Sequence, residues 1–385
     1  MKINTDLHIH SKYSIGSSPK MILPIICFEA RKKGIQLMGT GDCIHPKWLS
    51  EIKKHSIDNE TIEINEITLI PTTEIEDKNR VHHLLILPSI SKAEELSEIL
   101  SKYGNLETDG RPNIKLDGAC LAQIAKDIGA LIGPCHAFTP WTALYGFHDS
   151  LRDCYGDLTK YISFIELGLS ADANYADRIK ELENLTFLTN SDAHSPWSNK
   201  LAREFTQFNM PDTSFEGLKK AILRIQGYGA LLNVGFYPEE GKYNRSACIK
   251  CFKIYNFDEC KARNWKCVCG KRIKKGVFDR VNELANFDNP KHPKHRPDYL
   301  HTIPLSEIIK MALNHKSVNT KGVKLAWELL IKTHGNEIKI LTNVPIRELD
   351  CVNKKIINAI CAFRNKSVIV NPGGGGNYGS IQFKT

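Results

Sequence analysis

Strand-like and helix-like stretches alternate along the first 235 residues, and this alternation constrains the fold more than any other feature of the sequence. Short apolar runs with strand character lie at residues 2–10, 35–40, 68–74, 81–87, 131–135, 164–167 and 186–189. Helical patterns lie at residues 21–33, 91–102, 117–128 and 215–225. Such alternation is typical of parallel β/α units, and its length favours a closed barrel. No glycine-rich phosphate fingerprint follows the first run, which disfavours a dinucleotide-binding fold.

Polar side chains stand at or just past the carboxyl ends of these predicted strands. His8 and His10 point the same way because side chains alternate along a strand, and Asp192 and His194 repeat this spacing. In a β/α barrel the carboxyl ends of the strands form the face where active sites are built. The residues expected to meet there are His8, His10, Asp42, Glu74, His83, His136, Asp192 and His194.

These residue types are typical metal ligands. Imidazole and carboxylate groups without thiolate suit Zn²⁺, Mn²⁺ or Fe²⁺, and eight ligands are too many for one ion. We expect two or three divalent metals, zinc foremost and manganese or magnesium as alternatives, that activate a water and clamp phosphate oxygens. One choice stays open: residues 81–87 offer His82 to one face and His83 to the other, and the phase of the apolar residues that follow favours His83.

The charge of the chain is unevenly distributed. The net charge of +9 divides into −5 for residues 1–235 and +14 for residues 236–385, so the second part suits a polyanionic partner, with nucleic acid foremost. No apolar run approaches the length of a membrane span, and the N-terminus has no signal-like segment. Twelve cysteines without such a segment indicate a reducing compartment, and we expect a cytoplasmic protein.

A turn-rich junction at residues 235–241 predicts the first domain boundary, and paired cysteines follow it. Cys248 and Cys251, with Cys267 and Cys269, have the spacing of a structural zinc site, and Cys260 is the alternative ligand because the second pair has only one intervening residue. Basic residues directly after this segment are expected to contact nucleic acid: Lys271, Arg272, Lys274 and Lys275.

The remaining chain reads as mainly helical, at residues 305–313, 323–333 and 353–363. The predicted units are therefore a barrel (1–235), a cysteine-containing module (236–290) and a helical region (291–385). A glycine-rich stretch at 371–379 could either approach phosphates or form a flexible tail. Aromatic residues near the expected ligands could line a pocket for an extruded base or pack on the barrel rim: Phe138, Trp141, Tyr145 and Trp197.

The ordered set of strand-end ligands resembles the PHP superfamily. This resemblance implies a distorted (β/α)₇ barrel with a two- or three-metal phosphoesterase site. Asp42 stands where most members have the histidine of a Thr-Asp-His motif, and residues 13–16 lack the further histidine that many members use for a third metal. The metal site alone would also suit a small-molecule phosphoesterase of the histidinol-phosphatase type, but such an enzyme needs neither the basic second part nor the cysteines.

Longer motifs make the chain similar to the endonuclease Q family along nearly its whole length. They are Gly-Asp-Cys-Ile-His-Pro-Lys-Trp from Gly41, His-Ala-Phe-Thr-Pro-Trp-Thr from His136 and Asn-Ser-Asp-Ala-His-Ser-Pro-Trp from Asn190, followed by the four cysteines and the helical region. The resemblance implies a DNA repair endonuclease that nicks 5′ to deaminated bases (uracil, hypoxanthine, xanthine) and abasic sites. Some archaeal members bind the sliding clamp, but residues 380–385 contain no clear clamp-binding box.

Overall fold

A computed structural model describes residues 1–56 and 62–384. All the strands expected in the first part are present, and all but one have shorter bounds. The exception is the run at 68–74, which extends over 67–76 and is divided at Pro71, a residue with no N–H for a strand ladder. The strands are β1 (Lys2–Asp6), β2 (Leu37–Gly39), β4 (Ile67–Ile70), β5 (Thr72–Glu76), β6 (His82–Ile86), β7 (Leu131–Pro134), β8 (Phe164–Glu166) and β9 (Thr186–Leu188).

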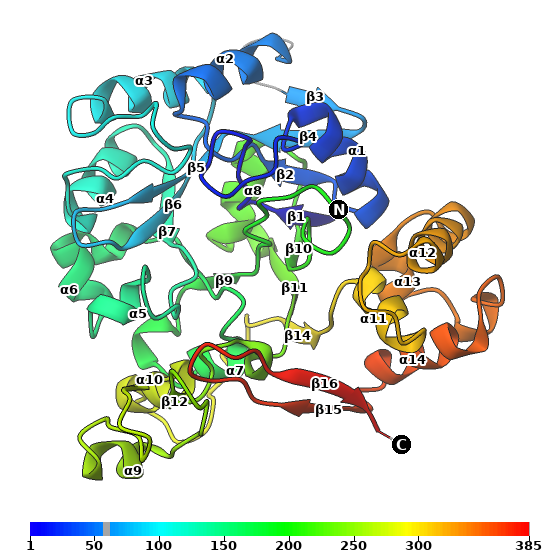
Figure 1. Cartoon of the computed structure of the whole chain (residues 1–385). Coiled ribbons are helices and arrows are strands. Elements are labelled where there is room, and N and C mark those ends of the chain that lie inside the picture. Colours follow the sequence, from blue (N-terminus) through cyan, green and yellow to red (C-terminus); the bar gives the residue numbers. More distant parts are fainter. Residues whose placement is uncertain (57–61, 385) are drawn as a thin grey trace.

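These strands close into a distorted barrel (Figure 1), as the sequence predicted. β2 pairs in parallel with β1 and with β4, whereas β6 runs antiparallel to both β5 and β7. A parallel bridge between Ile132 and Ile162 leads towards β8, which pairs in parallel with β9. A parallel bridge between Ile9 and Ala193 then returns the ring to the chain just after β1. The reversed β6 departs from the purely parallel arrangement expected for β/α units.

Further strands extend the barrel sheet on either side of β1 and β4. The sequence patterns did not indicate them: β3 (Ile62–Ile64), β10 (Phe205–Asn209), β11 (Gly229–Gly235) and β14 (Asp298–His301). β14 pairs in parallel with β11, and Arg296 just before it binds the buried Asp177 carboxylate at 2.9 Å. The predicted boundary at 290 therefore assigns one strand of the barrel sheet to the C-terminal unit.

The expected helices of the first part are present, with additional short ones. They are α1 (Leu23–Lys33), α2 (Pro46–Lys54), α3 (Ile90–Leu100), α4 (Gly118–Asp127), α5 (Leu144–Phe147), α6 (Leu151–Tyr155), α7 (Ala173–Ala176) and α8 (Phe215–Ile222). α1 begins after Ile22 with a proline in its first turn, two residues later than the pattern at 21–33 indicated. It ends as expected at Gly34, which adopts φ +97°.

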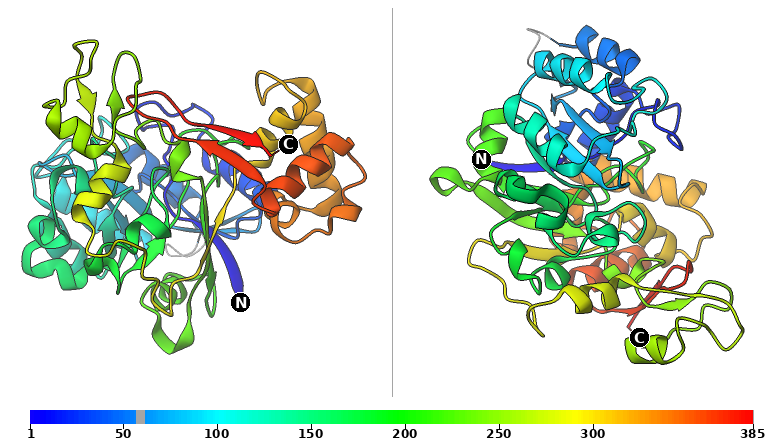
Figure 2. Two further views of the ribbon diagram at one scale, coloured as in Figure 1. Left: turned by 90° about the horizontal axis from the view of Figure 1, so that it is seen from below. Right: turned by 90° about the vertical axis from the view of Figure 1, so that its left-hand side faces the viewer.

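The cysteine-containing module projects from one end of the barrel, and the helical region lies to its side (Figures 1 and 2). The module contains β12 (Ala247–Cys248), α9 (Phe257–Ala262), β13 (Ile273–Lys274) and α10 (Val277–Leu284). The helical region contains α11 (Leu305–Ala312), α12 (Lys321–His334), α13 (Glu337–Thr342) and α14 (Lys354–Arg364), followed by the hairpin of β15 (Val368–Asn371) and β16 (Ser380–Phe383). Its own apolar core includes Ile309, Trp327 and Phe363.

The glycine-rich loop between β15 and β16 reaches back to the cysteine-containing module (Figure 1). Arg245 N–H donates to the Gly373 carbonyl at 2.9 Å, and Gly376 N–H donates to the Lys242 carbonyl at 2.9 Å. These contacts contradict the flexible tail, and the approach to phosphates stays a prediction. The loop packs two separate parts of the chain together. Across residues 1–56 and 62–384, no helix combines the length and apolar character needed to cross a membrane.

Candidate metal centre

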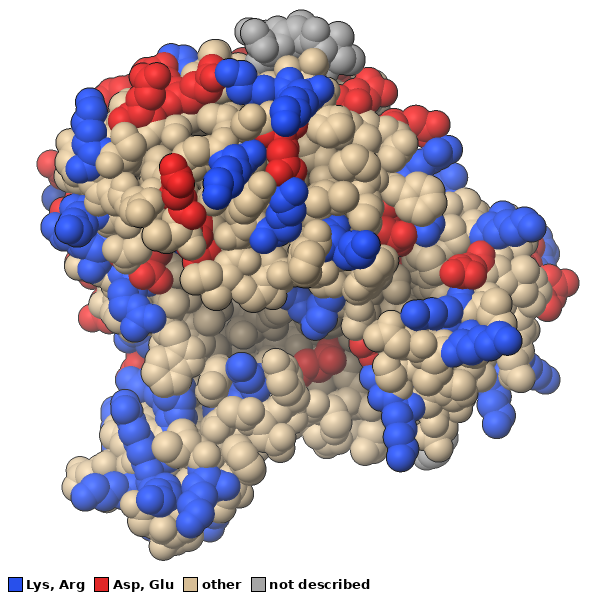
Figure 3. All heavy atoms as spheres, turned by 45° about the horizontal axis from the view of Figure 1, so that its top comes forward, with Lys and Arg blue, Asp and Glu red and all other residues tan. Residues whose placement is uncertain are grey.

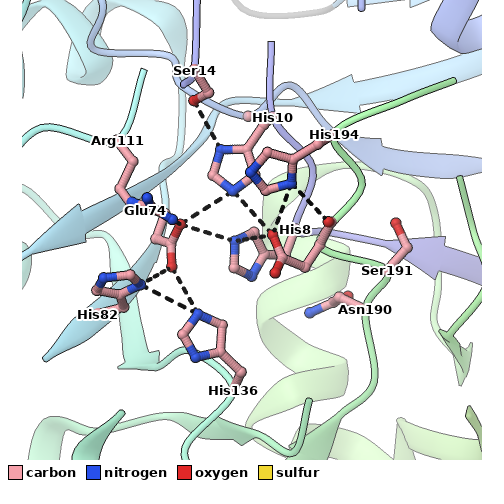
Figure 4. Close-up of polar contacts among 12 residues, drawn as sticks. His8, His10, Ser14, Glu74, His82, Arg111, His136, Asn190, Ser191 and His194 are labelled. Atoms are coloured by element: carbon pink, nitrogen blue, oxygen red, sulfur yellow. Dashed lines mark hydrogen bonds and ion pairs between the residues drawn. The ribbon is translucent and has the colours of Figure 1, made fainter. Parts of the chain in front are cut away.

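Glu74 at the middle of β5 is the centre of a cluster of histidines (Figure 4). This residue is 2% exposed. Oε2 lies 3.2 Å from His10 Nε2 and 3.5 Å from His8 Nε2. Oε1 lies 2.6 Å from His82 Nδ1 and 3.0 Å from His136 Nε2. One buried carboxylate therefore joins two pairs of imidazoles.

Asp192 is a second carboxylate beside the same two histidines, His8 and His10. Its Oδ1 lies 3.1 Å from His10 Nε2, 3.5 Å from His194 Nδ1 and 3.8 Å from His8 Nε2. Asp192 and His136 both adopt positive φ, at +47° and +28°. Such backbone is costly for residues other than glycine, by about 1–3 kcal/mol each, and it is typical of functional sites. The strained loops aim both side chains at the centre.

Several ligand atoms of the cluster have no hydrogen-bond partner. His8 Nε2, His10 Nε2 and Asp192 Oδ1 are buried and unsatisfied among the described residues, although each lies near the others. Groups whose ligand atoms lie within 4.8 Å of one another are His8–His10–Glu74, His10–Asp192–His194 and Glu74–His82–His136. Buried unpaired atoms are costly, and a cation would satisfy them. The donor set of imidazoles and carboxylates fits divalent metals.

The electrostatics of the cluster favour positive charge at its centre. Burial disfavours the charged form of His10, but Asp42, Asp192 and Glu74 outweigh it and raise the pKa of His10 well above its usual value. Burial would raise the pKa of Glu74, but His82 and His8 outweigh it and lower that pKa well below the usual value. The carboxylates are thus held ionised, ready to bind cations.

The structure corrects the choice of His83. In the antiparallel pair β5–β6, Glu76 lies opposite His82 and Glu74 opposite Leu84. Directly opposed residues share a face, so His82 points with Glu74 into the cluster and His83 points away. The His83 Nδ1 lies 2.8 Å from the Tyr155 hydroxyl and its Nε2 lies 3.4 Å from Asp77. All of β6 is buried, so the apolar phase carried no information about the face.

Asp42 also differs from its expected place. Its Oδ1 lies 3.0 Å from His10 Nδ1, and its Oδ2 accepts from Ser11 N–H at 2.6 Å and the Ser14 hydroxyl at 2.9 Å. It stands behind His10, on the side away from Glu74. Burial would raise its pKa, but His10 outweighs this and lowers it. Such a carboxylate orients an imidazole and fixes its tautomer.

Glu166 and Arg111 belong to the site and were not among the expected residues. Glu166 Oε2 lies 2.8 Å from His8 Nδ1 and accepts from His136 N–H at 3.1 Å, so it matches the role of Asp42 at the neighbouring histidine. Its place at the end of β8 was a signal that could have indicated it. Arg111 Nη1 lies 3.4 Å from Glu74 Oε2 and its side chain is 29% exposed. It stands in a loop, where strand-end reasoning has no signal.

The four cysteines predicted to bind zinc come together in the module. Sγ of Cys248 lies 3.5 Å from Sγ of Cys269, and Sγ of Cys251 lies 3.5 Å from Sγ of Cys267. All four sulfurs form one group of candidate ligand atoms. Cys260 is fully buried in the module core outside that group. The first choice of ligands agrees with this geometry.

The basic and aromatic candidates occupy different environments. Lys271 and Arg272 are exposed, Lys275 pairs with Glu283 at 2.7 Å, and Lys274 Nζ lies 3.1 Å from the centre of the Trp141 ring. Burial lowers the pKa of Lys274 to about 8.

The four aromatic candidates divide into two kinds. Trp141 and Trp197 are each 47% exposed, whereas Phe138 and Tyr145 are buried. The Tyr145 hydroxyl also donates to Glu181 at 2.7 Å. Phe138 and Tyr145 therefore pack in the barrel rim, and Trp141 and Trp197 remain accessible to a ligand.

The fold and the site define the class of this protein: a distorted β/α barrel with a candidate metal cluster of histidines and carboxylates, followed by a four-cysteine group and a helical region. Comparison with known proteins identifies the family. The lesion-specific endonuclease PfuEndoQ from Pyrococcus furiosus superposes with a TM-score of 0.95 at 45% identity, over 100% of this chain and 96% of its own. Endonuclease Q in complex with a 27-mer duplex substrate with an abasic lesion at the active site gives 0.93 at 45% identity, over 100% and 97%. The chain belongs to the endonuclease Q family.

Two further matches involve a protein of Methanocaldococcus jannaschii. Its uncharacterized protein MJ0043 is 45% identical over 255 residues, which are 65% of this chain and 32% of that protein, so the match spans about a third of the relative's length. The family described as MJ0043 C-terminal domain matches residues 304–367. That range coincides with helices α11 to α14.

Proposed function

We propose that this protein is a metal-dependent DNA repair endonuclease that hydrolyses the phosphodiester 5′ to a deaminated base (uracil, hypoxanthine or xanthine) or an abasic site. The observation that carries the proposal is the likeness over the whole chain to endonucleases of this family, one of them bound to an abasic duplex. The clustered histidines and carboxylates supply the chemistry that such a reaction needs.

The proposed metal ligands are the side chains that converge on Glu74. Two or three divalent ions, zinc foremost and manganese or magnesium as alternatives, would lie among His8, His10, Glu74, His82, His136, Asp192 and His194. Bound there, the metals would activate a water and offset negative charge on the phosphate. His83 is not proposed as a ligand, and Asp42 is proposed as an orienting residue.

The remaining site residues position these ligands and the substrate. Asp42 and Glu166 accept hydrogen bonds from the Nδ1 atoms of His10 and His8, which leaves the Nε2 atoms free to coordinate. Arg111 is the cation at the rim, next to the Glu74 carboxylate. Its guanidinium would hold a non-bridging phosphate oxygen of the scissile linkage.

The second part of the chain would hold the duplex. We propose one structural zinc ion on Cys248, Cys251, Cys267 and Cys269. Lys and Arg side chains gather on the projecting module, across a hollow from the barrel (Figure 3). Contacts from Lys271, Arg272, Lys274 and Lys275 would be to the DNA backbone, and Trp141 and Trp197 would contact bases near the lesion. The expectation of a cytoplasmic protein stays a prediction, and no sliding-clamp contact is proposed.

The direct test uses labelled duplexes that carry uracil, hypoxanthine or an abasic site, and an intact duplex, each with and without added Zn²⁺, Mn²⁺ or Mg²⁺. We expect metal-dependent cleavage on the 5′ side of the lesion only. Faster hydrolysis of p-nitrophenyl phosphate or histidinol phosphate than of damaged DNA would instead indicate a small-molecule phosphoesterase.

A pair of adjacent variants tests the ligand set. His82→Ala should lower cleavage at least a hundredfold and reduce the metal content, because it removes a donor from the Glu74 cluster. His83→Ala is the matched control: it should lower the melting temperature, because it leaves Tyr155 without its buried partner, but retain metal and cleavage. Equal loss of metal in both variants would contradict the proposed set.

A further inference from the structure

Aromatic rings from three separate segments form a row beside the cysteine-containing module, with the two outer rings exposed and the middle ring half-buried. We define this aromatic row as Trp141, Tyr243 and Tyr378. The rings of Trp141 and Tyr243 lie 5.9 Å apart at 80°. Lys242 Nζ lies 5.3 Å from the Tyr243 ring centre and 5.7 Å from that of Tyr378, and Lys274 Nζ contacts Trp141. Lys242 thus bridges Tyr243 and Tyr378, and the edge contact between Trp141 and Tyr243 joins the third ring.

Tyr378 is held in place although it is 69% exposed. It lies on the glycine-rich loop, where Gly375 is buried at φ +66° and a Cβ there would come within 2.3 Å of the Cys248 carbonyl. Gly379, which follows Tyr378, donates its N–H to the Glu240 carbonyl at 3.1 Å. The loop is thus fixed by its contacts, yet the exposed Tyr378 ring adds little buried surface to the fold. Its tyrosine is therefore available for a ligand.

The aromatic row begins at the rim of the metal centre. Trp141 precedes Thr142, whose carbonyl accepts the backbone N–H of His82 at 3.2 Å. His82 contacts Glu74 at the centre of the cluster. The row thus extends from the segment beside the metal centre, across the edge of the module, to the end of the glycine-rich loop next to β16.

We propose that the aromatic row is a stacking surface for unpaired nucleobases of the strand next to the cleaved phosphodiester. The inference rests on the proposed function and deepens it. Ring faces stack on any base, and adjacent lysines attract the phosphates between bases, so such a surface binds unpaired nucleotides with little sequence preference. Single exposed aromatics are ordinary on protein surfaces, but these three rings are in contact with one another or with a shared lysine, so they are not scattered.

The test compares Tyr378→Ala and Tyr243→Ala, alone and combined, in the full-length protein with its metals. The probe is an abasic duplex with a 2-aminopurine next to the lesion and a cleavage-resistant phosphorothioate at the scissile position. Affinity is measured by fluorescence anisotropy and stacking by quenching of the 2-aminopurine. Tyr161→Ala is the matched control, since Tyr161 is also exposed beside a lysine, with Lys126 Nζ 4.5 Å from its ring.

We expect the combined variant to bind the abasic duplex at least about fivefold more weakly and to lose the quenching. Tyr378→Phe should retain both, because stacking needs the ring and not the hydroxyl. Intact duplex should bind as before, and the dependence of affinity on salt should not change, because no charge is removed.

The outcomes separate this inference from the proposed function. If the wild type neither binds nor cleaves lesion-bearing DNA, the proposed function fails and the stacking surface fails with it. If the wild type cleaves, but the combined variant behaves like Tyr161→Ala, only the stacking surface is wrong. An equal loss of affinity for intact and abasic duplexes would also overturn it, because it would indicate a general structural role.

Discussion

A buried ion pair between Lys33 and Glu337 fixes the helical region to the barrel, and breaking it gives a quantitative test of the fold. Lys33 ends α1 and Glu337 begins α13, 304 residues later, and both side chains are about 2% exposed. Lys33 Nζ donates to Glu337 Oε1 at 2.5 Å and to the Ser198 carbonyl at 2.7 Å. Glu337 also accepts from Trp327 Nε1 at 2.7 Å and Leu305 N–H at 3.1 Å.

The expected cost follows from what each variant leaves behind. Glu337→Gln leaves a buried ammonium without its opposing charge, which should cost roughly 3–5 kcal/mol. Lys33→Met leaves a carboxylate with two remaining N–H donors, so its cost should lie near the lower end of that range. The double variant removes both charges and should be more stable than the sum of the single changes predicts, because neither charge is left unpaired.

Native-state hydrogen exchange in α13 measures the free energy of opening at the contact itself. Lys53→Met is the control, because Lys53 pairs with Glu94 on the surface, where the two side chains are 45% and 41% exposed. Its cost should be below about 1 kcal/mol. Lys33 also holds the Ser198 carbonyl, and Ser198 follows Asp192 and His194 in the same loop. The Lys33 variant should therefore also cleave DNA more slowly. If Lys33→Met costs no more than Lys53→Met, the reasoning about burial is refuted.

Three further predictions concern other parts of the chain. Changing Cys248 and Cys251 to Ser should remove one zinc ion and weaken DNA binding, while the barrel keeps its metals. Zinc content is measured by atomic emission, and an unchanged content would exclude this site. Changing the four basic residues of the module to Gln should flatten the slope of log affinity against log salt. The slope should change by about 0.9 for each phosphate that these side chains neutralise in the wild type, and the preference among lesions should stay the same. An unchanged slope would mean that DNA binds elsewhere on the protein. Burial raises the pKa of Glu204 from 4.5 to about 8, so stability should fall as pH rises between these values, and Glu204→Gln should remove that fall in melting temperature. A wild-type slope in the Gln variant would contradict this.

Much of the barrel could be predicted from the sequence because each strand carried a local signal. The apolar runs located β1, β2 and β4 to β9, and the helical patterns located α1, α3, α4 and α8 but not α2 or α5 to α7. The strand-end rule brought together His8, His10, Glu74, His136, Asp192 and His194. β14 could not be predicted in the same way. Its short, half-exposed segment becomes a strand only through pairing with β11, a long-range contact that no local pattern encodes.

The strand-end rule locates a residue, but it does not say which way the side chain points. Asp42 meets the rule, yet φ +48° and a bond from Ser11 N–H turn its carboxylate to the rear of His10. His82 and His83 both meet the rule, and only the antiparallel register with Glu76 separates them. Register is a property of two strands together, so one strand's sequence cannot supply it. The carboxylates of Asp42 and Glu166 then have equivalent places behind His10 and His8, and each leaves one Nε2 atom directed at Glu74. Orientation of the two histidines by buried carboxylates thus explains why the cluster needs more acidic residues than could bind metal directly.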